Sequence, residues 1–455
     1  MRIVTAALLA VMLSTLAVSV QAQEPTAPGA RRAAVTPVRG EKFQTQYIRI
    51  GNQAEGLLYE PTTAPPKGIA LVFTHPNRNT FNEPLGREMS SRGYRVLMIN
   101  YRGDSDSPEA FPEGYLPSVS QGVAFLRTLP GVQRVVLVGH SGGGHLASLY
   151  DNIAEHGPSA CQGPEKIYPC RAEGLAGLAK PDGVILIDST LGAFHQMSAV
   201  DPAVDGNRRI GSLDMFIAAN GYDPAAKGAT YSAAFAKRFY AAQAARNAQV
   251  VNDALARLHA IEQGKSDYSD DEPLVIRGMG VRASGARLYQ PDTAFAAHTK
   301  NPHLLLRADG TDAVMVVQSV RPPEGQRVGS ALHSLELMTQ DTTVRRFLAG
   351  SAIRTGPDFA ITADGITGVD WRSSYNSTPA NADGISVPAL VLTMSCHYLV
   401  VPGEIIFDHL GSKDKTYASV EGAVHGFSPC KPEYGDTVKR TFDFVDAWLS
   451  KEGRF

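Results

Sequence analysis

Short apolar runs recur along residues 42–190, and stretches with a helical spacing of apolar residues separate them. Lys42–Ile50 and Glu55–Tyr59 alternate apolar and polar positions, which is typical of half-buried strands. Helices are predicted at residues 83–92 and 118–129. Four runs are mostly apolar, as parallel strands buried on both faces are: residues 69–74, 94–100, 135–138 and 183–187. The alternation predicts an α/β fold, with helices on both faces of a mostly parallel sheet.

The chain after residue 190 follows a different pattern. It contains a long alanine-rich stretch with helical spacing, Tyr231–Gln263, and a strand-like patch, Ala313–Val320. Strand-like runs return at Val387–Met394 and Lys415–Val420, which we expect to be the last two strands. The insertion before them, roughly two hundred residues, is far longer than a crossover requires. The expected segments are a first core part at residues 42–189, the insertion at residues 190–385, and a second core part at residues 386–455.

The N-terminal segment resembles an export signal. One early arginine, Arg2, precedes an apolar stretch and then small residues up to Ala22, so residues 1–22 are predicted to be a secretory signal peptide cleaved after Ala22. The stretch is too short to be a lasting membrane span. Residues 23–41 are rich in Ala, Pro and Arg without periodicity, which predicts a flexible leader. We therefore expect a secreted or periplasmic protein.

The composition limits the classes of ligand and cross-link that we expect for this chain. The 455 residues carry a formal net charge of -2, so the chain is not basic enough to indicate nucleic-acid binding. Its four cysteines are an even number in an exported chain, which predicts two disulfides, and three pairings are possible. No spacing typical of zinc ligands is present, so we expect no metal. The cysteines are Cys161, Cys170, Cys396 and Cys430.

The clearest chemical motif is G-x-S-x-G, formed by Gly139, His140, Ser141, Gly142 and Gly143. It follows an apolar run and precedes a helical pattern, so the serine is expected on a sharp turn from strand to helix. The outer two glycines leave room for neighbouring backbone at such a turn. The start of the helix can stabilise an oxyanion. The motif predicts a nucleophile elbow, whereas a phosphate-binding loop would require a following lysine.

Four features make the chain resemble the α/β-hydrolase superfamily over residues 42–190 and 386–455. They are the GHSGG elbow, the HPN turn after residues 69–74, NYRGDSDS after residues 94–100, and a late histidine in EGAVHGF. The resemblance implies an α/β-hydrolase fold without metal or organic cofactor, in which residues 190–385 form a large, mainly helical cap over the active site. The candidate pocket residues are Phe194, Met197, Met215, Phe216, Tyr222 and the segment Phe111–Tyr115.

The resemblance also assigns the base and the oxyanion donors. The family takes one donor from the turn after the third strand, where Pro76 has no N–H group. The donors carried over are therefore the backbone N–H groups of Asn77 and Gly142. His425, in the loop after the last strand, takes the role of general base. The other histidines near these motifs, His75, His140 and His145, are interpreted as packing or hydrogen-bonding residues.

The orienting carboxylate has two candidates. Most members of the superfamily carry it just after the penultimate strand, but His397 or Tyr398 occupies that position here. Asp188 follows residues 183–187, as the acid does in haloalkane dehalogenases and some lipases, and Glu404 lies later in the chain. Both preserve the order serine, acid, histidine. Asp188 is the preferred candidate and Glu404 the alternative.

The same resemblance favours one disulfide pairing. Cys396 follows the penultimate strand, and Cys430 lies five residues after His425. Because parallel neighbours end at the same edge of a sheet, a bond between these cysteines would hold the histidine loop. Cys161 and Cys170 would then close a short loop after the elbow helix.

These residues together predict an exported serine hydrolase that cleaves small-molecule or polymeric carboxylic esters through an acyl-enzyme. An amidase, peptidase or acyltransferase with the same triad is an alternative. A catalytically silent, hydrolase-like binding protein is a rival of another class, against which the joint presence of Ser141 and His425 counts. Dehalogenase chemistry is disfavoured because it requires an aspartate at the elbow.

Overall fold

The computed structural model describes residues 42–52, 54–63, 65–76, 79–101, 110–206, 208–279, 285–324 and 339–455. All of them belong to one compact unit, residues 37–455. The predicted signal peptide, the leader and Asn77 lie outside the described residues. Within the described ranges, no helix combines the length and apolarity needed to cross a bilayer.

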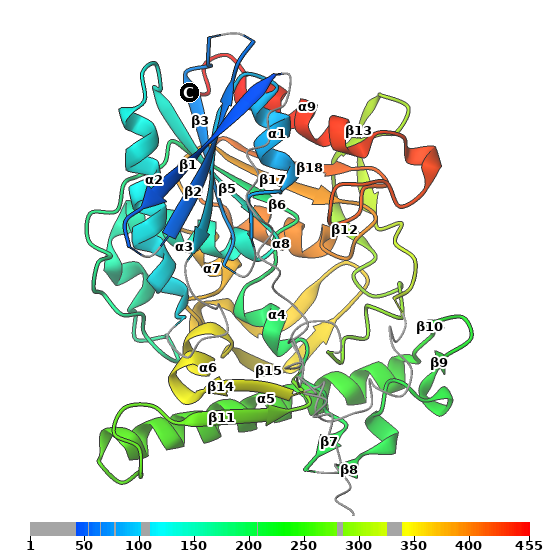
Figure 1. Cartoon of the computed structure of the whole chain (residues 1–455). Coiled ribbons are helices and arrows are strands. Elements are labelled where there is room, and N and C mark those ends of the chain that lie inside the picture. Colours follow the sequence, from blue (N-terminus) through cyan, green and yellow to red (C-terminus); the bar gives the residue numbers. More distant parts are fainter. Residues whose placement is uncertain are drawn as a thin grey trace, which may run out of the picture. The chain divides into compact units, whose positions relative to one another are not determined.

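A ten-stranded sheet forms the centre of the fold (Figure 1). Its strands are β1 (Phe43–Ile50), β2 (Ala54–Pro61), β3 (Ile69–Thr74), β4 (Arg95–Tyr101), β5 (Arg134–His140), β6 (Gly183–Ile187), β12 (His298–Leu306), β13 (Asp312–Gln318), β17 (Ala389–Met394) and β18 (Lys415–Val420). Their order is β1-β2-β4-β3-β5-β6-β17-β18-β12-β13. The strands from β4 to β12 pair in parallel, and β1, β2 and β13 pair antiparallel at the two edges. The predicted α/β class is confirmed.

Both faces of the central strands are buried because helices cover each face, whereas the edge strands β1 and β13 are largely exposed. The covering helices are α1 (Pro84–Ser90), α2 (Leu116–Thr128), α3 (Gly142–His156), α8 (Val400–His409) and α9 (Thr437–Leu449), and α7 (Thr378–Ala382) packs on α3 and α8. Val135 and Leu137 of β5 join the core with α2 and α3, whereas Val136 and Val138 join the core with α1 and α9. Side chains alternate between the faces of a strand, so a strand covered on both sides is apolar throughout.

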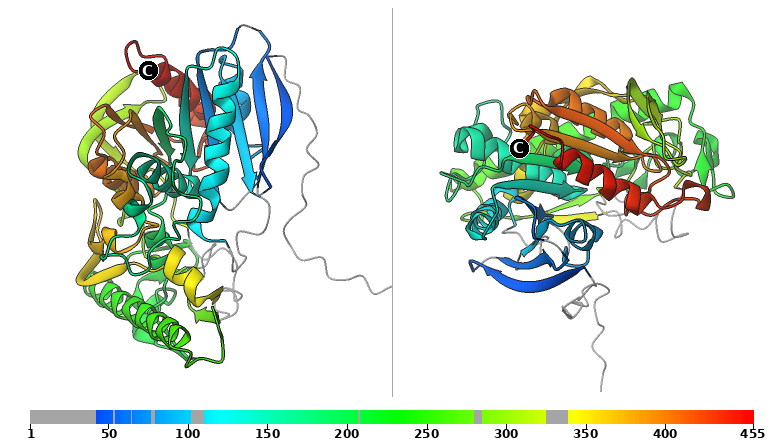
Figure 2. Two further views of the ribbon diagram at one scale, coloured as in Figure 1. Left: turned by 90° about the vertical axis from the view of Figure 1, so that its left-hand side faces the viewer. Right: turned by 90° about the horizontal axis from the view of Figure 1, so that it is seen from above.

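Two strands of the insertion belong to the main sheet, which corrects the predicted boundaries of the cap. β12 and β13 fall within residues 190–385, yet Leu304 to Leu306 of β12 pair in parallel with Ala418 to Val420 of β18. Figure 2 shows this yellow-green pair at one edge of the sheet and the blue strands β1 and β2 at the other. The pairing satisfies backbone groups that would otherwise leave β18 as an open edge. The patch Ala313–Val320 is therefore largely part of the core.

The rest of the insertion contains short hairpins besides its helices. Its longest element, α5, covers most of the predicted helix, and the Ser232 hydroxyl caps it by accepting from Phe235 N. With α5 (Ala233–Glu262), the insertion contains the helices α4 (Ala193–Met197) and α6 (Val344–Gly350) and the strands β7 (Val204–Asp205), β8 (Arg208–Arg209), β9 (Tyr222–Asp223), β10 (Gly228–Ala229), β11 (Pro273–Arg277), β14 (Thr339–Thr343), β15 (Arg354–Ile361) and β16 (Ile366–Asp370). The strands form four two-stranded sheets, β7–β8, β9–β10, β11–β14 and β15–β16.

Candidate active site

Ser141 lies on the sharp turn between β5 and α3. Its backbone angles, φ 58° and ψ -123°, are rarely adopted by residues with a side chain. The neighbouring glycines are required by space, because a Cβ atom on Gly139 would overlap the Gly143 carbonyl, and one on Gly143 would overlap the Thr74 carbonyl. This is the geometry of a nucleophile elbow, and Gly142 begins the helix immediately after the serine.

Asp188 lies at the end of β6 and is fully buried. Its Oδ2 atom is 2.6 Å from Nδ1 of His425, and its Oδ1 atom accepts a hydrogen bond from Met394 N. Burial alone would raise the pKa of this carboxyl, but His397 and His425 more than offset burial and lower the pKa below its usual range. An ionised Asp188 holds the His425 proton on Nδ1, which leaves Nε2 as a base.

The loop after β18 is held in place around His425. The Cys396–Cys430 disulfide joins the loops that follow β17 and β18, and Cys396 N donates to Ala423 O at 2.9 Å. The His140 Nε2 atom is 2.9 Å from the carbonyl oxygen of His425. The second disulfide is Cys161–Cys170, so both bonds follow the favoured pairing. The fixed loop limits the freedom of the imidazole beside Asp188.

A strained serine at a strand-to-helix turn, followed in the chain by an Asp–His pair, is the arrangement for which α/β hydrolases are known. The model of the Alpha/beta hydrolase family matches residues 71–317, more than half of the chain. The chain belongs to this family.

Comparison with solved structures gives similarities of fold at low identity. The first, a sugar hydrolase (YeeB) from Lactococcus lactis, is 19% identical over 32% of this chain and 54% of its own, with a TM-score of 0.24. Brefeldin A esterase, a bacterial homologue of human hormone sensitive lipase, is 13% identical over 89% of this chain and 75% of its own, with a TM-score of 0.39. Est1E from Butyrivibrio proteoclasticus is 9% identical over 89% of this chain and 97% of its own, with a TM-score of 0.37. The alignment spans about half of the YeeB chain. No curated protein matches the chain.

The alternative acid, Glu404, forms its hydrogen bonds with residues other than His425. It lies in α8, where its carboxylate accepts from Lys300 N at 2.6 Å and Asn301 N at 2.8 Å and contacts His303 Nε2 at 2.8 Å. Burial would raise its pKa, but these partners lower it below the usual value. Glu404 therefore anchors the start of β12 to α8, and Asp188 is the carboxylate that lies beside His425.

His397 occupies the position after β17 where this family usually carries its acid. Its Nδ1 atom lies 2.8 Å from the same Oδ2 atom of Asp188, although without the alignment of a hydrogen bond. Its ring stacks on His425 with centroids 4.6 Å apart. The three side chains bring potential metal-ligating atoms within 4.8 Å of one another. The sequence marks His397 as a departure from the family but does not predict its contact with Asp188. The available signal was a polar residue in the position that the acid usually occupies.

The other histidines around the elbow are packed into the protein. Burial lowers the pKa of His145 to about 4 and holds the pKa of His140 and of His195 well below the usual histidine value. His75 lies beside the elbow, since a Cβ atom on Gly142 would be 3.4 Å from its Nε2 atom. These positions agree with the packing roles expected for His75, His140 and His145.

The predicted pocket residues of the insertion are packed as well. Phe194, Met197, Met215 and Tyr222 are buried, and Phe216 packs edge-to-face on Tyr222. Phe194 contacts Phe359 and Trp371. In the segment Phe111–Tyr115, Phe111 lies under the Arg171 guanidinium, and Glu113 accepts from Tyr375 Oη and Arg171 N. The contacts of these residues are those of core packing.

Proposed function

We propose that this protein is a secreted or periplasmic serine hydrolase that cleaves carboxylic esters through an acyl-enzyme. The observation that carries the proposal is the 2.6 Å contact between buried Asp188 and His425 Nδ1, in a chain whose Ser141 has the strained backbone of an elbow. The chemistry requires no cofactor beyond these side chains.

In the proposed reaction, Ser141 Oγ attacks the ester carbonyl while His425 Nε2 accepts the proton of the Ser141 hydroxyl. The oxyanion receives hydrogen bonds from the backbone of Gly142 and, by family resemblance, of Asn77. The tetrahedral intermediate collapses, its C–O bond breaks, and His425 returns the proton to the leaving alcohol. Water then attacks the acyl-enzyme, His425 accepts a proton from it, and Ser141 recovers that proton as the carboxylic acid departs. Asp188 stabilises the imidazolium in both halves.

Export is part of the proposal. The signal-like sequence of residues 1–22 and the two disulfides support an oxidising compartment. N-terminal sequencing of the protein recovered from the periplasm or medium is expected to begin at Gln23. Recovery of uncleaved protein from the cytoplasm would contradict export without affecting the catalytic assignment.

The catalytic assignment is tested on a panel of 4-nitrophenyl esters of increasing acyl length. We expect Ser141→Ala to lower kcat on the order of a millionfold and Asp188→Asn on the order of ten-thousandfold. Glu404→Gln is the matched control, because it removes a buried carboxylate that does not contact His425. It should lower thermal stability and leave kcat within a few-fold of wild type.

Two outcomes would overturn the proposal. If wild type and Ser141→Ala are equally inert and a phosphonate probe leaves Ser141 unlabelled, the protein is a hydrolase-like binding protein. If the probe labels Ser141 but amides or a second acyl acceptor react in preference to ester hydrolysis, the triad stands and the substrate class is wrong.

A further inference from the structure

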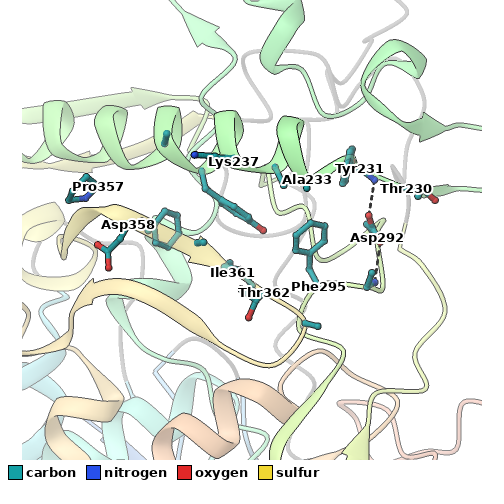
Figure 3. Close-up of a pocket in the computed structure, with 17 residues that line it drawn as sticks. Thr230, Tyr231, Ala233, Lys237, Asp292, Phe295, Pro357, Asp358, Ile361 and Thr362 are labelled. Atoms are coloured by element: carbon teal, nitrogen blue, oxygen red, sulfur yellow. Dashed lines mark hydrogen bonds between the residues drawn. The ribbon is translucent and has the colours of Figure 1, made fainter.

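The strand β13 forms one edge of the main sheet (Figure 1), and among the described strands it pairs with β12 alone. The outer side of such a strand carries N–H and C=O groups that can bond to another strand. The cavity between α5 and the β15–β16 hairpin is a different feature, because residues of α5 and β15 enclose a space of about 660 Å³, the size of a small-molecule site, between them (Figure 3). The free edge of β13 can instead take a partner strand.

The side chains of β13 are apolar on both faces of the strand. Val314 is 72% exposed and Met315 is 42% exposed, and as neighbours in a strand they point to opposite faces. The strand carries one ionised side chain, Asp312, at its start. It contains neither lysine nor proline, the residues with which native proteins protect their sheet edges. An exposed edge with these properties is a site at which strands of separate chains associate.

The opposite edge of the sheet is protected in a way that β13 is not. Besides Tyr47, β1 exposes Gln44, Gln46 and Arg49, and polar and charged side chains on an edge disfavour pairing with a second chain. Pairing of β1 with β13 of the next copy would also repeat from copy to copy into an open filament. Pairing of β13 with itself closes a two-fold dimer and uses the apolar edge of both copies. A second copy of this chain is therefore the partner that the two edges favour.

The hairpin turn between β12 and β13 shows which backbone groups of β13 face outward. Arg307 N donates to Thr311 O at 3.0 Å, so these two residues form a hydrogen-bonded pair. Bonded and non-bonded pairs alternate along an antiparallel ladder, so Ala313 and Met315 also bond to β12. The residues that alternate with them turn their N–H and C=O groups to the free edge, and these residues are Asp312, Val314, Val316 and Gln318.

From this pattern we infer that two copies of the protein associate through β13, antiparallel and about a two-fold axis at Met315. In this register, Val314 of each copy bonds through its backbone to Val316 of the other. Asp312 likewise faces Gln318, so no like charges lie opposite each other. The two main sheets then form one continuous sheet. The dimer goes beyond the proposed esterase function and does not depend on it.

Sedimentation velocity of the full-length protein at increasing concentration is expected to show a reversible equilibrium between monomer and dimer. Val314→Lys puts a charge at the centre of the interface and should raise the dimer dissociation constant about tenfold or more. Val275→Lys is the matched control, because Val275 is 58% exposed on β11, outside the main sheet, and it should leave the constant unchanged. Tyr47→Lys introduces the same charge on β1 and should also leave the constant unchanged.

Cross-linking tests the register. Across the two-fold axis the two Met315 residues form a non-hydrogen-bonded pair, whose Cα atoms lie about 4.5 Å apart, within the range that a disulfide spans. Met315→Cys should therefore give a covalent dimer on mild oxidation, since the native cysteines are already paired. Val314→Cys is the control, because Val314 is more exposed but lies two residues out of register with its own counterpart, and it should cross-link far less.

The inference is overturned if the protein stays monomeric up to its solubility limit, if Val314→Lys and Val275→Lys give the same dissociation constant, or if Tyr47→Lys weakens the dimer instead. It is also overturned if Val314→Cys cross-links as readily as Met315→Cys. If Val314→Lys fails to fold, as judged by circular dichroism, the comparison of the two cysteine variants decides alone. Because none of these measurements uses catalysis, failure of the esterase assay would leave this result intact.

Discussion

One carboxylate oxygen of Asp188, Oδ2, lies close to two imidazole rings. The Nδ1 atom of His425 is 2.6 Å from it and the Nδ1 atom of His397 is 2.8 Å from it. Burial is the largest influence on His397 and holds its pKa below the usual histidine value, although Asp188 acts in the opposite direction. His397 is therefore neutral near pH 7. Its neutral ring lies against the carboxylate oxygen that also contacts His425 without adding a charge, and so, in the proposed mechanism, weakens the hold of Asp188 on the imidazolium of His425.

Replacing His397 with Asn should move the acid limb of kcat/KM to higher pH, by on the order of one pH unit. The reason is that Asp188 then stabilises only the cation of His425. The ionisable groups that act on His397 are Asp188, His425 and Glu324. Tyr398→Phe is the control, because it keeps the ring against His397 at 4.2 Å and should leave the profile unchanged. Superimposable pH profiles for His397→Asn and wild type would contradict the shared-carboxylate account.

The sequence predicts the roles of some residues of the candidate site more directly than those of others. Ser141 is marked by a local motif, because an elbow needs glycines at fixed offsets. The choice between Asp188 and Glu404 depends on tertiary contacts instead. Glu404 is engaged by His303 and by two amides about a hundred positions earlier in the chain, and no local pattern reveals those partners.

At the scale of elements, the fully buried strands were the most predictable. The bounds of β3 and β6 agree with two of the apolar runs because these strands are short and both of their faces are covered, and β18 has the bounds of the strand-like run Lys415–Val420. The sequence places the strand-like patch Ala313–Val320 in the cap and does not predict β12, because neither segment identifies its partner strand. β12 pairs with β18 more than a hundred residues later, and only that pairing makes it part of the core.

The two disulfides should affect activity differently. Cys396–Cys430 ties the loop that carries His397 to the loop that carries His425, whereas Cys161–Cys170 closes a short loop after α3. We expect Cys396→Ser/Cys430→Ser to lower kcat at least tenfold with a smaller change in KM, because the imidazole loses its fixed position. Steady-state kinetics below the melting temperature of each variant measures this.

The matched control is Cys161→Ser/Cys170→Ser. With sequence separations of 34 and 9, the loop-closure estimates are about 4 and about 3 kcal/mol, so the two variants should lose similar stability. The control should nevertheless retain near-wild-type kcat. Equal losses of kcat in both variants would mean that destabilisation, rather than a displaced His425, explains the effect.

For the whole molecule, burial of histidines makes stability depend on pH. Four histidines near the elbow, His140, His145, His195 and His397, have pKa values lowered mainly by burial. Below pH 6.5 the unfolded chain binds protons at these positions that the folded chain does not. These four histidines therefore lower the free energy of unfolding as the pH falls through that range, whereas Asp151, whose pKa burial raises well above the usual aspartate value, acts in the opposite direction.

Urea titrations at pH 7.5, 6 and 5, with the disulfides intact, should show this decrease. His145, whose pKa is lowered from 6.5 to about 4, alone accounts for on the order of 3 kcal/mol between pH 7 and pH 4. Asp188 adds to the loss only at lower pH, because its pKa is already below that of a free aspartate. His145→Gln should flatten the dependence by removing one such proton, whatever it does to stability at pH 7.5. An unfolding free energy that stays constant from pH 7.5 to 5, or an unchanged slope in His145→Gln, would show that these imidazoles titrate alike in the folded and unfolded chain.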